Sequence, residues 1–349
     1  MTVKNLIDKL CTTHFLTKEE YIYILSHFTR DDARYAAKCA VNVRQKIYGR
    51  DVYIRGLIEI SNHCKNDCLY CGIRKSNISC TRYRLLNDEI LACCDSGYKL
   101  GFRTFVLQGG EDMFYTDSVL CALISSIKEK YEDCAVTLSL GERSDDSYRA
   151  LFCAGADRYL LRHETANKEH YNLLHPPKMS YENRMRCLYS LKKAGFQTGC
   201  GFMVGSPYQT FETIADDLKF IESFKPEMCG IGPFIPHSAT PFSDKARGSV
   251  ELTLFCLSLV RLIVPTVLLP ATTALGTADD TGREKGILAG ANVIMPNLSP
   301  ISQRKKYELY NGKAISGNED AMELENIKNQ IEKIGYRVNM SRGDVKREE

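Results

Sequence analysis

Short apolar segments alternate with longer amphipathic segments along most of the chain after residue 50. The short segments are rich in β-branched and aromatic residues, which is the pattern of buried strands. They lie at 52–60, 103–108, 135–140, 158–161, 198–204, 229–232, 267–271 and 292–295. Between them lie segments long enough for a helix each, such as 87–97, 115–130, 181–194, 213–224 and 252–263. This alternation predicts an α/β protein with eight strands.

The sequence motifs that directly follow the predicted strands indicate how the eight strands are arranged. Eight parallel strands with crossover helices close naturally into a (β/α)8 TIM-type barrel, whose active site is built by the loops after the strands. Gly109-Gly110-Glu111 follows the second predicted strand, and Arg162-His163-Glu164-Thr165 follows the fourth. An open doubly wound sheet fits the alternation almost as well. Candidate ligand residues at every strand end favour the closed barrel.

Both ends of the chain lack the strand pattern and carry helical signals instead. Thr17 and Glu20 have the spacing of a helix capping box, and the apolar residues of 36–41 have helical spacing. Near the other end, four residues share one face of an amphipathic helix: Leu324, Ile327, Ile331 and Ile334.

The expected organisation has three parts. Residues 1–50 form a helical lead-in, residues 51–317 form the barrel, and residues 318–349 form a helical tail packed on the barrel. The chain has no internal repeat, low-complexity tract or Pro/Gly/Ser-rich linker that would mark a second autonomous domain.

Composition and charge limit the classes of function. The chain has 349 residues, 44% of them apolar, and a net charge of +3 from 46 basic and 43 acidic residues. This balance does not indicate a nucleic-acid or anionic-membrane partner. No apolar run approaches the roughly 18 to 20 residues that cross a bilayer, and no signal peptide precedes the polar start. We expect a soluble protein in the reducing cytoplasm, because its 15 cysteines are mostly scattered.

Three of these cysteines carry the chemistry. Cys64, Cys68 and Cys71 form a CxxxCxxC loop after the first predicted strand and have no obvious fourth ligand. A four-iron cluster held by three thiolates keeps one iron open for a small molecule, which suggests a catalyst. Structural zinc is the main competitor, but it requires four ligands, and His63 is awkwardly adjacent to Cys64.

If the small molecule is S-adenosylmethionine (SAM), its amino and carboxylate groups need partners. Gly109, Gly110 and Glu111 can bring backbone close to the amine, and Glu164 can accept a hydrogen bond from it. Arg184 can bind the carboxylate as a fork. Without the cysteine motif, Glu164 and Arg184 would read as a surface ion pair. Tyr70 can cover the cluster or the adenine.

With these residues assembled, the chain resembles the radical SAM superfamily, and within it the [FeFe]-hydrogenase maturases. The similarity covers about residues 50–315. Besides the cysteine loop, these segments carry it: 53–59, 137–142, 158–167, 230–237, 270–277 and 290–297. The last two discriminate best, because the whole superfamily shares the cysteine loop. Biotin synthase and methylornithine synthase have similar barrels but differ in these segments.

The resemblance implies a closed barrel with one [4Fe-4S] cluster and SAM at its top and a cavity beneath. Cys64, Cys68 and Cys71 match the cluster ligands. The family positions around SAM match Thr137, Ser139, Glu164 and Arg184, with Gly109, Gly110 and Glu111 in the amine-binding segment. The family positions that line the lower cavity match Thr272, Thr273 and Met295, with Tyr307 and Tyr310 as additions. Packing of the barrel interior is the alternative for this second group. We expect a single cluster, because no cysteine follows Cys256.

The function implied is assembly of the di-iron subcluster of [FeFe]-hydrogenase. The enzyme would use a 5′-deoxyadenosyl radical on an iron-cysteine carbonyl/cyanide synthon. Its partners would be this small organometallic or amino-acid-derived substrate, an external electron donor, companion maturases and a scaffold protein, with no nucleic acid and no membrane. One alternative is a radical SAM mutase or sulfur-inserting enzyme of the methylornithine synthase or biotin synthase type. Another is a non-enzymatic protein with zinc at the three cysteines.

Overall fold

The protein is described here from a computed structural model of the chain, in which residues 2–313 and 320–346 are described. The strands are β1 (Asp51–Ile54), β2 (Gly56–Ser61), β3 (Thr104–Gly109), β4 (Ala135–Ser139), β5 (Arg158–Leu160), β6 (Gln197–Cys200), β7 (Met203–Val204), β8 (Met228–Cys229), β9 (Gly232–Pro233), β10 (Val293–Ile294) and β11 (Arg337–Asn339). The predicted α/β class is confirmed, because parallel strands alternate with helices along the chain.

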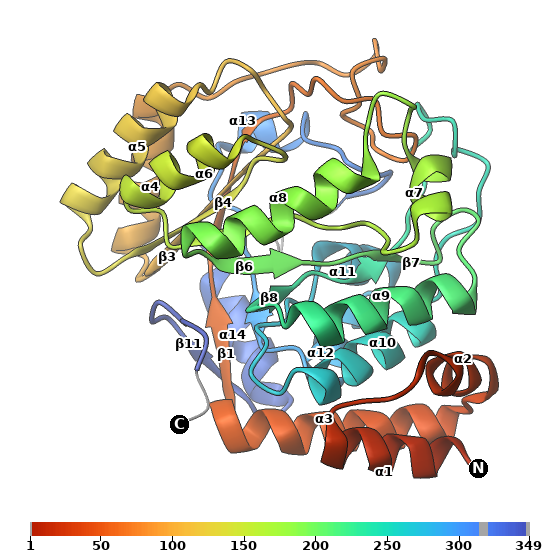
Figure 1. The fold of residues 1–349 in the computed structure, drawn as a ribbon. Helices are drawn as coiled ribbons and strands as arrows, with labels where there is room; N and C mark the ends of the chain where they lie inside the picture. The colour runs from red at the N-terminus through yellow and green to blue at the C-terminus, as the bar shows by residue number, and fades with distance from the viewer. Residues whose placement is uncertain (1, 314–319, 347–349) are drawn as a thin grey trace.

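Helices surround these strands (Figure 1). They are α1 (Val3–Thr13), α2 (Lys18–His27), α3 (Arg30–Tyr48), α4 (Asn87–Lys99), α5 (Asp117–Lys130), α6 (Asp145–Cys153), α7 (Lys168–Leu174), α8 (Tyr181–Ala194), α9 (Phe211–Phe224), α10 (Val250–Ile263), α11 (Thr273–Ala278), α12 (Gly282–Leu288), α13 (Ile301–Arg304) and α14 (Leu324–Lys333), with a 3-10 turn η2 (Ala321–Glu323) before α14.

The main sheet has six strands in the order β2-β3-β4-β5-β6-β8, all parallel. A single row of paired residues crosses five of these strands and shows their common register: Leu57, Val106, Thr137, Arg158 and Gln197. The parallel direction places all the loops that follow these strands at one edge of the sheet, which is where ligands bind in such folds.

The seventh predicted strand, at 267–271, is not a regular strand. Only isolated parallel bridges occur there, from Leu268 to Met228 and from Pro270 to Val293. Pro270 has no N–H to donate to a ladder, which accounts for the interruption. The bridges still connect β8 to β10, and β10 pairs in parallel with β1, which leads into β2.

The chain ends pack against this framework. Helices α1 to α3 lie together along one side of the molecule, where α3 and α1 contact α10, and α2 contacts α9 (Figure 1). The predicted capping box is present at the start of α2, where Thr17 and Glu20 each bond the other's backbone N–H. The C-terminal part is not purely helical as expected, because β11 follows α14 and pairs in parallel with β1. The expected boundary at 317 and 318 lies outside the described residues.

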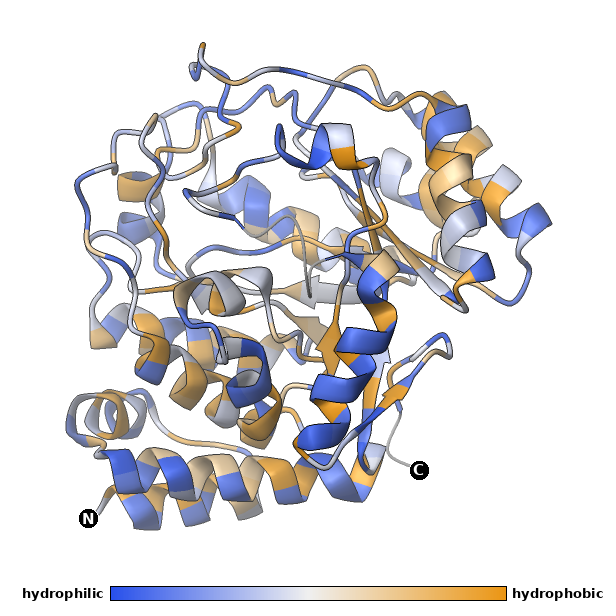
Figure 2. Ribbon diagram, turned by 180° about the vertical axis from the view of Figure 1, so that it is seen from behind, coloured by the Kyte–Doolittle hydropathy of each residue, from blue (hydrophilic) through white to orange (hydrophobic). Residues whose placement is uncertain are grey.

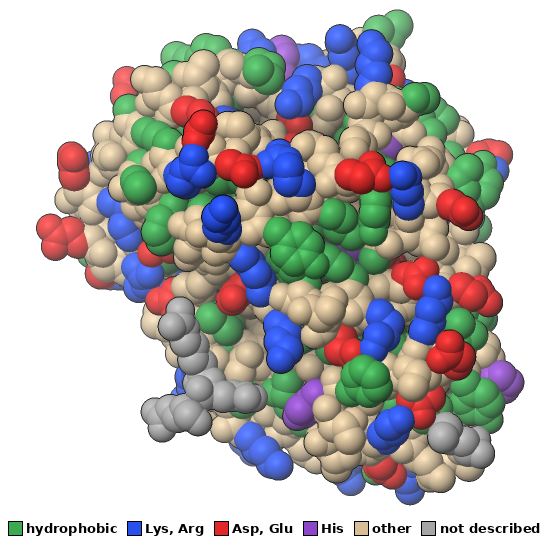
Figure 3. All heavy atoms as spheres, viewed as in Figure 1, with side chains coloured by type: hydrophobic (Ala, Val, Ile, Leu, Met, Phe, Trp, Pro, Cys, Tyr) green, Lys and Arg blue, Asp and Glu red, His purple; other side chains and the backbone are tan. Residues whose placement is uncertain are grey.

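The hydrophobic core lies between the strands and the helices. Every residue of β2 is buried, and Figure 2 shows mostly apolar strands, whereas the helices carry apolar and polar stripes. Charges of both signs are interspersed over the face drawn in Figure 3. Among the described helices, none combines the length and apolar character that crossing a bilayer requires.

Candidate active site

A cavity of about 300 Å3 opens at the carboxyl ends of the strands. Its wall combines the cysteine loop after β2 with residues that follow β3, β4, β5 and β9. The predicted site residues that line it are Cys64, Cys68, Tyr70, Cys71, Gly109, Gly110, Glu111, Ser139, Glu164, Arg184, Thr272, Tyr307 and Tyr310. The fold therefore brings together residues that are separated by more than 200 positions in the sequence.

Three predicted site residues lie outside the cavity lining. Thr137 is buried in β4, and its hydroxyl has no hydrogen-bond partner among the described residues. Thr273 is the first residue of α11, directly after the cavity residue Thr272. Met295 is partly buried and packs against an apolar cluster that includes Met228 and Leu268. Their roles at the cavity therefore stay predictions.

The cysteine loop is irregular and is fixed by backbone hydrogen bonds to other parts of the fold. Lys65 N–H donates to the carbonyl of Glu111 at 3.0 Å, and Leu69 N–H donates to that of Leu174 at 3.0 Å. Within the loop, the Asp67 carboxylate accepts hydrogen bonds from Arg74 Nε at 2.7 Å and from Ser76 N–H at 3.0 Å. The three thiols are therefore presented on a segment tied to the loops after β3 and α7.

Two glycines allow close packing around the cysteine loop and Glu111. A Cβ on Gly110 would lie 2.2 Å from the carbonyl oxygen of His63, and one on Gly141 would lie 1.9 Å from Cγ of Glu111. Gly141 also has a φ of +76°, which side chains rarely adopt. Within the described part of the chain, the buried Glu111 Oε2 atom has no hydrogen-bond partner, although it forms an ion pair with Lys65 Nζ at 3.2 Å.

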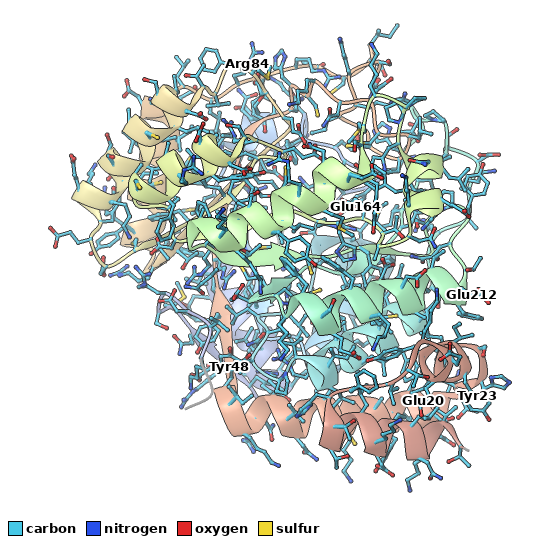
Figure 4. The ribbon with its side chains drawn as sticks, in the orientation of Figure 1. Glu20, Tyr23, Tyr48, Arg84, Glu164 and Glu212 are labelled. Carbon is cyan, nitrogen blue, oxygen red and sulfur yellow. The ribbon has the colours of Figure 1, made fainter. Side chains whose placement is uncertain are left out.

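A second acidic residue, Glu164, reaches the cavity from a strained turn. Its φ is +65°, and its N–H donates to the carbonyl of Gly201 at 3.0 Å. Arg162 Nη2 and Glu164 Oε2 form an ion pair at 3.1 Å. Among residues 2–313 and 320–346, neither atom makes a hydrogen bond with good geometry, and Arg162 Nε has no hydrogen-bond partner. Figure 4 shows Glu164 in the interior near α8. Buried polar atoms without partners at one cavity are the groups a polar ligand would satisfy.

The turn that carries Glu164 is supported from behind by His163 and Asp217, both fully buried. Gly201 N–H donates to His163 Nδ1 at 3.1 Å, so the proton of the neutral ring is on Nε2, which faces Asp217 Oδ1 at 3.3 Å. Asp217 Oδ1 also accepts the Ala166 N–H at 2.5 Å. Burial lowers the pKa of His163 to about 3 and raises that of Asp217, so burial opposes charge on both groups.

Arg184 approaches from α8 with its guanidinium fixed in place. Its Nε donates to Glu142 Oε1 at 2.5 Å, and its Nη1 donates to the carbonyl of Arg162 at 2.6 Å. Asn183 donates to the other oxygen of Glu142 at 2.5 Å. These contacts satisfy Nε and Nη1 and hold the guanidinium of Arg184 at the cavity, which Arg184 lines.

Tyr70 is held by a pair of aromatic neighbours. His175 Nδ1 donates to the Tyr171 carbonyl at 2.9 Å, so its Nε2 accepts the hydrogen bond from the Tyr70 hydroxyl at 3.2 Å. The rings of Tyr70 and His175 meet edge to face at 5.5 Å. Tyr70 is therefore a rigid wall of the cavity between Cys68 and Cys71.

The donor set fits a cluster better than a single ion. Within the described residues, no three His, Cys, Asp or Glu side chains are placed to bind one metal ion together. A [4Fe-4S] cluster binds each thiolate at a different iron, so its ligands stay farther apart than those of zinc. Burial raises the pKa of Cys64 and of Cys68, and that of Cys71 to about 12. Binding must therefore release thiol protons. The unpartnered atoms of Glu111, Glu164 and Arg162 in turn suit the polar end of an amino acid.

Two functional candidates escaped the sequence-based selection. Arg162 lines the cavity and has two unpartnered nitrogens, and Glu142 orients Arg184. Both stand in segments that the resemblance singled out, 158–167 and 137–142, so the signal was present in the sequence. The sequence alone could not show that the Arg162 side chain points to the cavity or that the Glu142 side chain points to Arg184.

Comparison with known proteins identifies the relatives of the chain. The sequence profile described as "Radical SAM superfamily" matches residues 58–221. The "[FeFe] hydrogenase maturase subunit HydE" of Thermotoga maritima is 42% identical over 347 residues, which cover 99% of this chain and 99% of that protein. The 3-methylornithine synthase of Methanosarcina barkeri is 28% identical over 85% of this chain and 83% of its own.

Two solved structures resemble the fold closely. Methylornithine synthase (PylB) has a TM-score of 0.84 at 25% identity and covers 96% of this chain and 97% of its own. HydG, a maturase of the [FeFe]-hydrogenase, has a TM-score of 0.82 at 21% identity and covers 97% of this chain and 77% of its own. At that identity, the likeness to HydG concerns the fold alone.

Proposed function

The chain belongs to the HydE family of [FeFe] hydrogenase maturases, within the radical SAM superfamily, and from this premise we propose that it acts in assembly of the di-iron subcluster of [FeFe] hydrogenase. It is a radical SAM enzyme, and its family uses a [4Fe-4S] cluster and SAM. The observation that carries the proposal is the relation to HydE, which extends over nearly the whole of both chains.

The residues of the cavity have separate roles in this proposal. Cys64, Cys68 and Cys71 hold the cluster, and their thiol protons leave when it binds. Glu111 and Glu164 accept hydrogen bonds from the SAM amine, while Arg184 and Arg162 bind its carboxylate. Other residues of the cavity wall also contact SAM. Gly109, Gly110 and Ser139 approach its amino-acid part, Tyr70 covers one side of it, and Thr137 supports the wall. When bound, the two groups supply a reductively generated 5′-deoxyadenosyl radical.

The lower part of the cavity receives the substrate. We propose that it is an iron-cysteine carbonyl/cyanide synthon that lies against Thr272, Tyr307 and Tyr310, with Thr273 and Met295 behind them. We also propose that the bridges between β8, the 268–270 segment, β10 and β1 close the sheet into a (β/α)8 barrel. A closed barrel keeps water away from reactive species, which supports radical chemistry.

The setting of the reaction is part of the same proposal. An external electron donor, companion maturases and a scaffold protein are its expected partners. We place the protein in the cytoplasm, because thiolate ligands of a cluster require reducing surroundings. The proposed organisation remains a helical lead-in over 1–50, a barrel over 51–317 and a C-terminal part over 318–349 packed on the barrel.

The first test addresses the cofactors. The chain is reconstituted anaerobically with iron and sulfide, reduced, and studied by electron paramagnetic resonance with and without SAM, beside a Cys68→Ser variant. We expect a [4Fe-4S]+ signal that shifts on addition of SAM and is lost in the variant. A well-folded wild-type protein without an iron-sulfur signal would overturn the assignment.

The second test addresses the substrate. Cells that lack their own HydE and express [FeFe] hydrogenase receive either this chain or its Cys68→Ser variant. Recovery of hydrogenase activity with the wild type alone is the expected result. No recovery from a chain that passes the first test would instead favour an amino-acid mutase, the alternative to which the PylB likeness points.

A further inference from the structure

The long segment between β2 and α4 carries the three cysteines but has almost no regular structure. It runs from Asn62 to Leu86, and among the described residues its only ladder contact is an isolated bridge between Ser61 and Arg84. A loop of this length is held in one conformation only if something other than a helix or sheet fixes it. The side chain of Arg82 does so.

The Arg82 guanidinium donates four hydrogen bonds, all to backbone carbonyls of this segment. Nη1 donates to Asn62 at 2.5 Å and to Ile73 at 2.8 Å, and Nη2 donates to Arg74 at 2.6 Å and to Asn77 at 3.2 Å. Asn62 lies two residues before the first cysteine, and Ile73 lies two residues after the third. One planar group therefore ties together both ends of the cysteine loop.

The acceptors of Arg82 are themselves fixed. The Asn62 side chain donates to the carbonyls of Thr81 at 2.9 Å and Lys306 at 2.6 Å, and its oxygen accepts the Tyr83 N–H at 2.8 Å. The Asn77 side chain donates to the carbonyl of Gly72 at 2.6 Å. The network thus reaches from β2 to the segment around 306, and Arg82 is its centre.

The charge of Arg82 is not used in an ion pair. Over residues 2–313 and 320–346, no carboxylate lies within ion-pair distance of its nitrogens, whereas Arg74 pairs with Asp67 and Arg84 pairs with Asp112 on either side of it. Figure 4 shows Arg84 at the outer edge of the molecule. Arg82 is half-buried, and its four acceptors lie on the segment that carries the three thiols, so its positive charge is held beside the cysteine loop.

We propose that Arg82 is a positioning residue of the cluster site, which clamps both ends of the cysteine loop and favours the reduced state of the cluster through its unpaired charge. Net charge and hydrogen bonding around a cluster set its reduction potential, and reduction adds one negative charge. A nearby cation stabilises that added charge. This inference rests on the proposed cluster binding but not on the proposed role in hydrogenase maturation.

Two variants separate the clamp from the charge. Arg82→Lys keeps the charge but cannot serve four carbonyls from two nitrogens, and Arg82→Gln loses both. Arg103→Gln is the control, because Arg103 also donates to backbone carbonyls, at Tyr98 and Phe102, but pairs with Asp133 away from the loop. Each protein is reconstituted, and its midpoint potential and its rate of iron loss to a chelator are measured without SAM.

We expect both Arg82 variants to lose iron faster than wild type by about tenfold or more, as for other residues that orient metal ligands. The midpoint potential falls in Arg82→Gln and stays near the wild-type value in Arg82→Lys, and the control matches wild type in both measurements. Equal potentials in wild type and Arg82→Gln would overturn the electrostatic part, and unchanged iron loss in both variants would overturn the clamp. A wild-type chain without a cluster would instead overturn the proposed function.

Discussion

Charged side chains gather at both ends of the sheet, and Glu164 and Arg162 at one end differ from Arg158 at the other in how completely they are hydrogen-bonded. At the carboxyl end, the acids and arginines around the cavity keep unpartnered atoms, on Glu111, Glu164 and Arg162. At the amino end, Arg158 is fully buried, and every guanidinium nitrogen has an acceptor, including Asp344 at 2.5 Å and the Arg342 carbonyl at 2.8 Å.

This amino-end network belongs to the C-terminal segment. Arg342 donates to Asp344 at 2.9 Å and to Asp157 at 2.7 Å, and Gln197 donates to Asp344 at 3.0 Å. Residues 342–345 therefore cover the amino end of the sheet. Saturated pairing indicates stability, whereas buried unpaired groups that converge on a cavity indicate a ligand. Charged residues alone therefore do not identify a ligand site. Charged residues that lack hydrogen-bond partners and face a cavity do.

Among the variants at the carboxyl end of the sheet, Gly141→Ala is expected to have the largest effect. The new Cβ meets Glu111 at a residue with positive φ, so we expect SAM affinity to fall by about 100-fold or more and the unfolding free energy by about 1 to 3 kcal/mol. Gly335→Ala is the matched control, because its φ is +82° but nothing lies within 4 Å of the new Cβ. Equal SAM affinity in the two variants, measured by titration, would contradict the role of Glu111.

A milder change at the same end is Glu164→Gln, which keeps the shape and removes the charge. We expect the Kd for SAM to rise by about 10- to 100-fold, or about 1.5 to 3 kcal/mol. The unfolding free energy should change by less than about 1 kcal/mol, because Oε2 accepts no hydrogen bond from the described residues and its ion pair with Arg162 involves a partly exposed arginine. A large loss of stability with intact SAM binding would place Glu164 with the structural network instead.

At the amino end, Asp344→Asn should produce the reverse pattern. It removes the charge opposite a fully buried Arg158, but the Asp344 side chain is itself 40% exposed, so solvent screening reduces the cost. We expect a loss of about 1 to 2 kcal/mol in denaturant unfolding and an unchanged Kd for SAM. A weakened Kd would show that the two ends are coupled.

The effect of Asp344 also depends on pH. Burial raises its pKa, but the hydrogen bond from Arg342 and the charge of Arg158 lower it more, so the folded value lies below the unfolded one. A depressed carboxyl pKa stabilises the fold above the unfolded pKa of about 4, and this stabilisation is lost as the pH falls toward the folded value. The stability difference between wild type and Asp344→Asn should therefore be constant above about pH 5 and shrink below about pH 4. A difference that persists at lower pH would exclude the ion pair as its source.

The smallest effect is expected outside both regions. Cys153 is an exposed thiol on α6, so Cys153→Ser should leave iron content and SAM binding unchanged and shift the unfolding free energy by less than about 0.5 kcal/mol. Loss of iron in this variant would mean that the three loop cysteines are not the complete ligand set.

The success of the sequence-based predictions varied with how local the signal was. The first six predicted strand segments and the five predicted helices coincide with observed elements within a few residues, because apolar periodicity depends only on neighbours in the chain. Three of the segments were each predicted as one strand but are divided into two in the structure, at 52–60, 198–204 and 229–232, because the chain changes its pairing partner within each of them. The predicted strand at 267–271 is interrupted at Pro270. Strand β11 was missed, because it is short and half-buried and pairs with β1, which is distant in the sequence. Thr137, Thr273 and Met295 were expected at the cavity and are not among its lining residues.

The sequence by itself determined the alternating fold class, the cysteine loop and the identity of most cavity residues, because each is written in residue type and spacing. Only the tertiary structure decided which charged groups are paired. Arg158 begins strand β5, and Arg162 follows the last residue of the same strand by two positions. Asp344 reaches Arg158 from far along the chain, whereas Arg162 lies against Glu164, its near neighbour in the sequence, at the cavity. Pairing depends on contacts between distant segments, so local patterns cannot specify it.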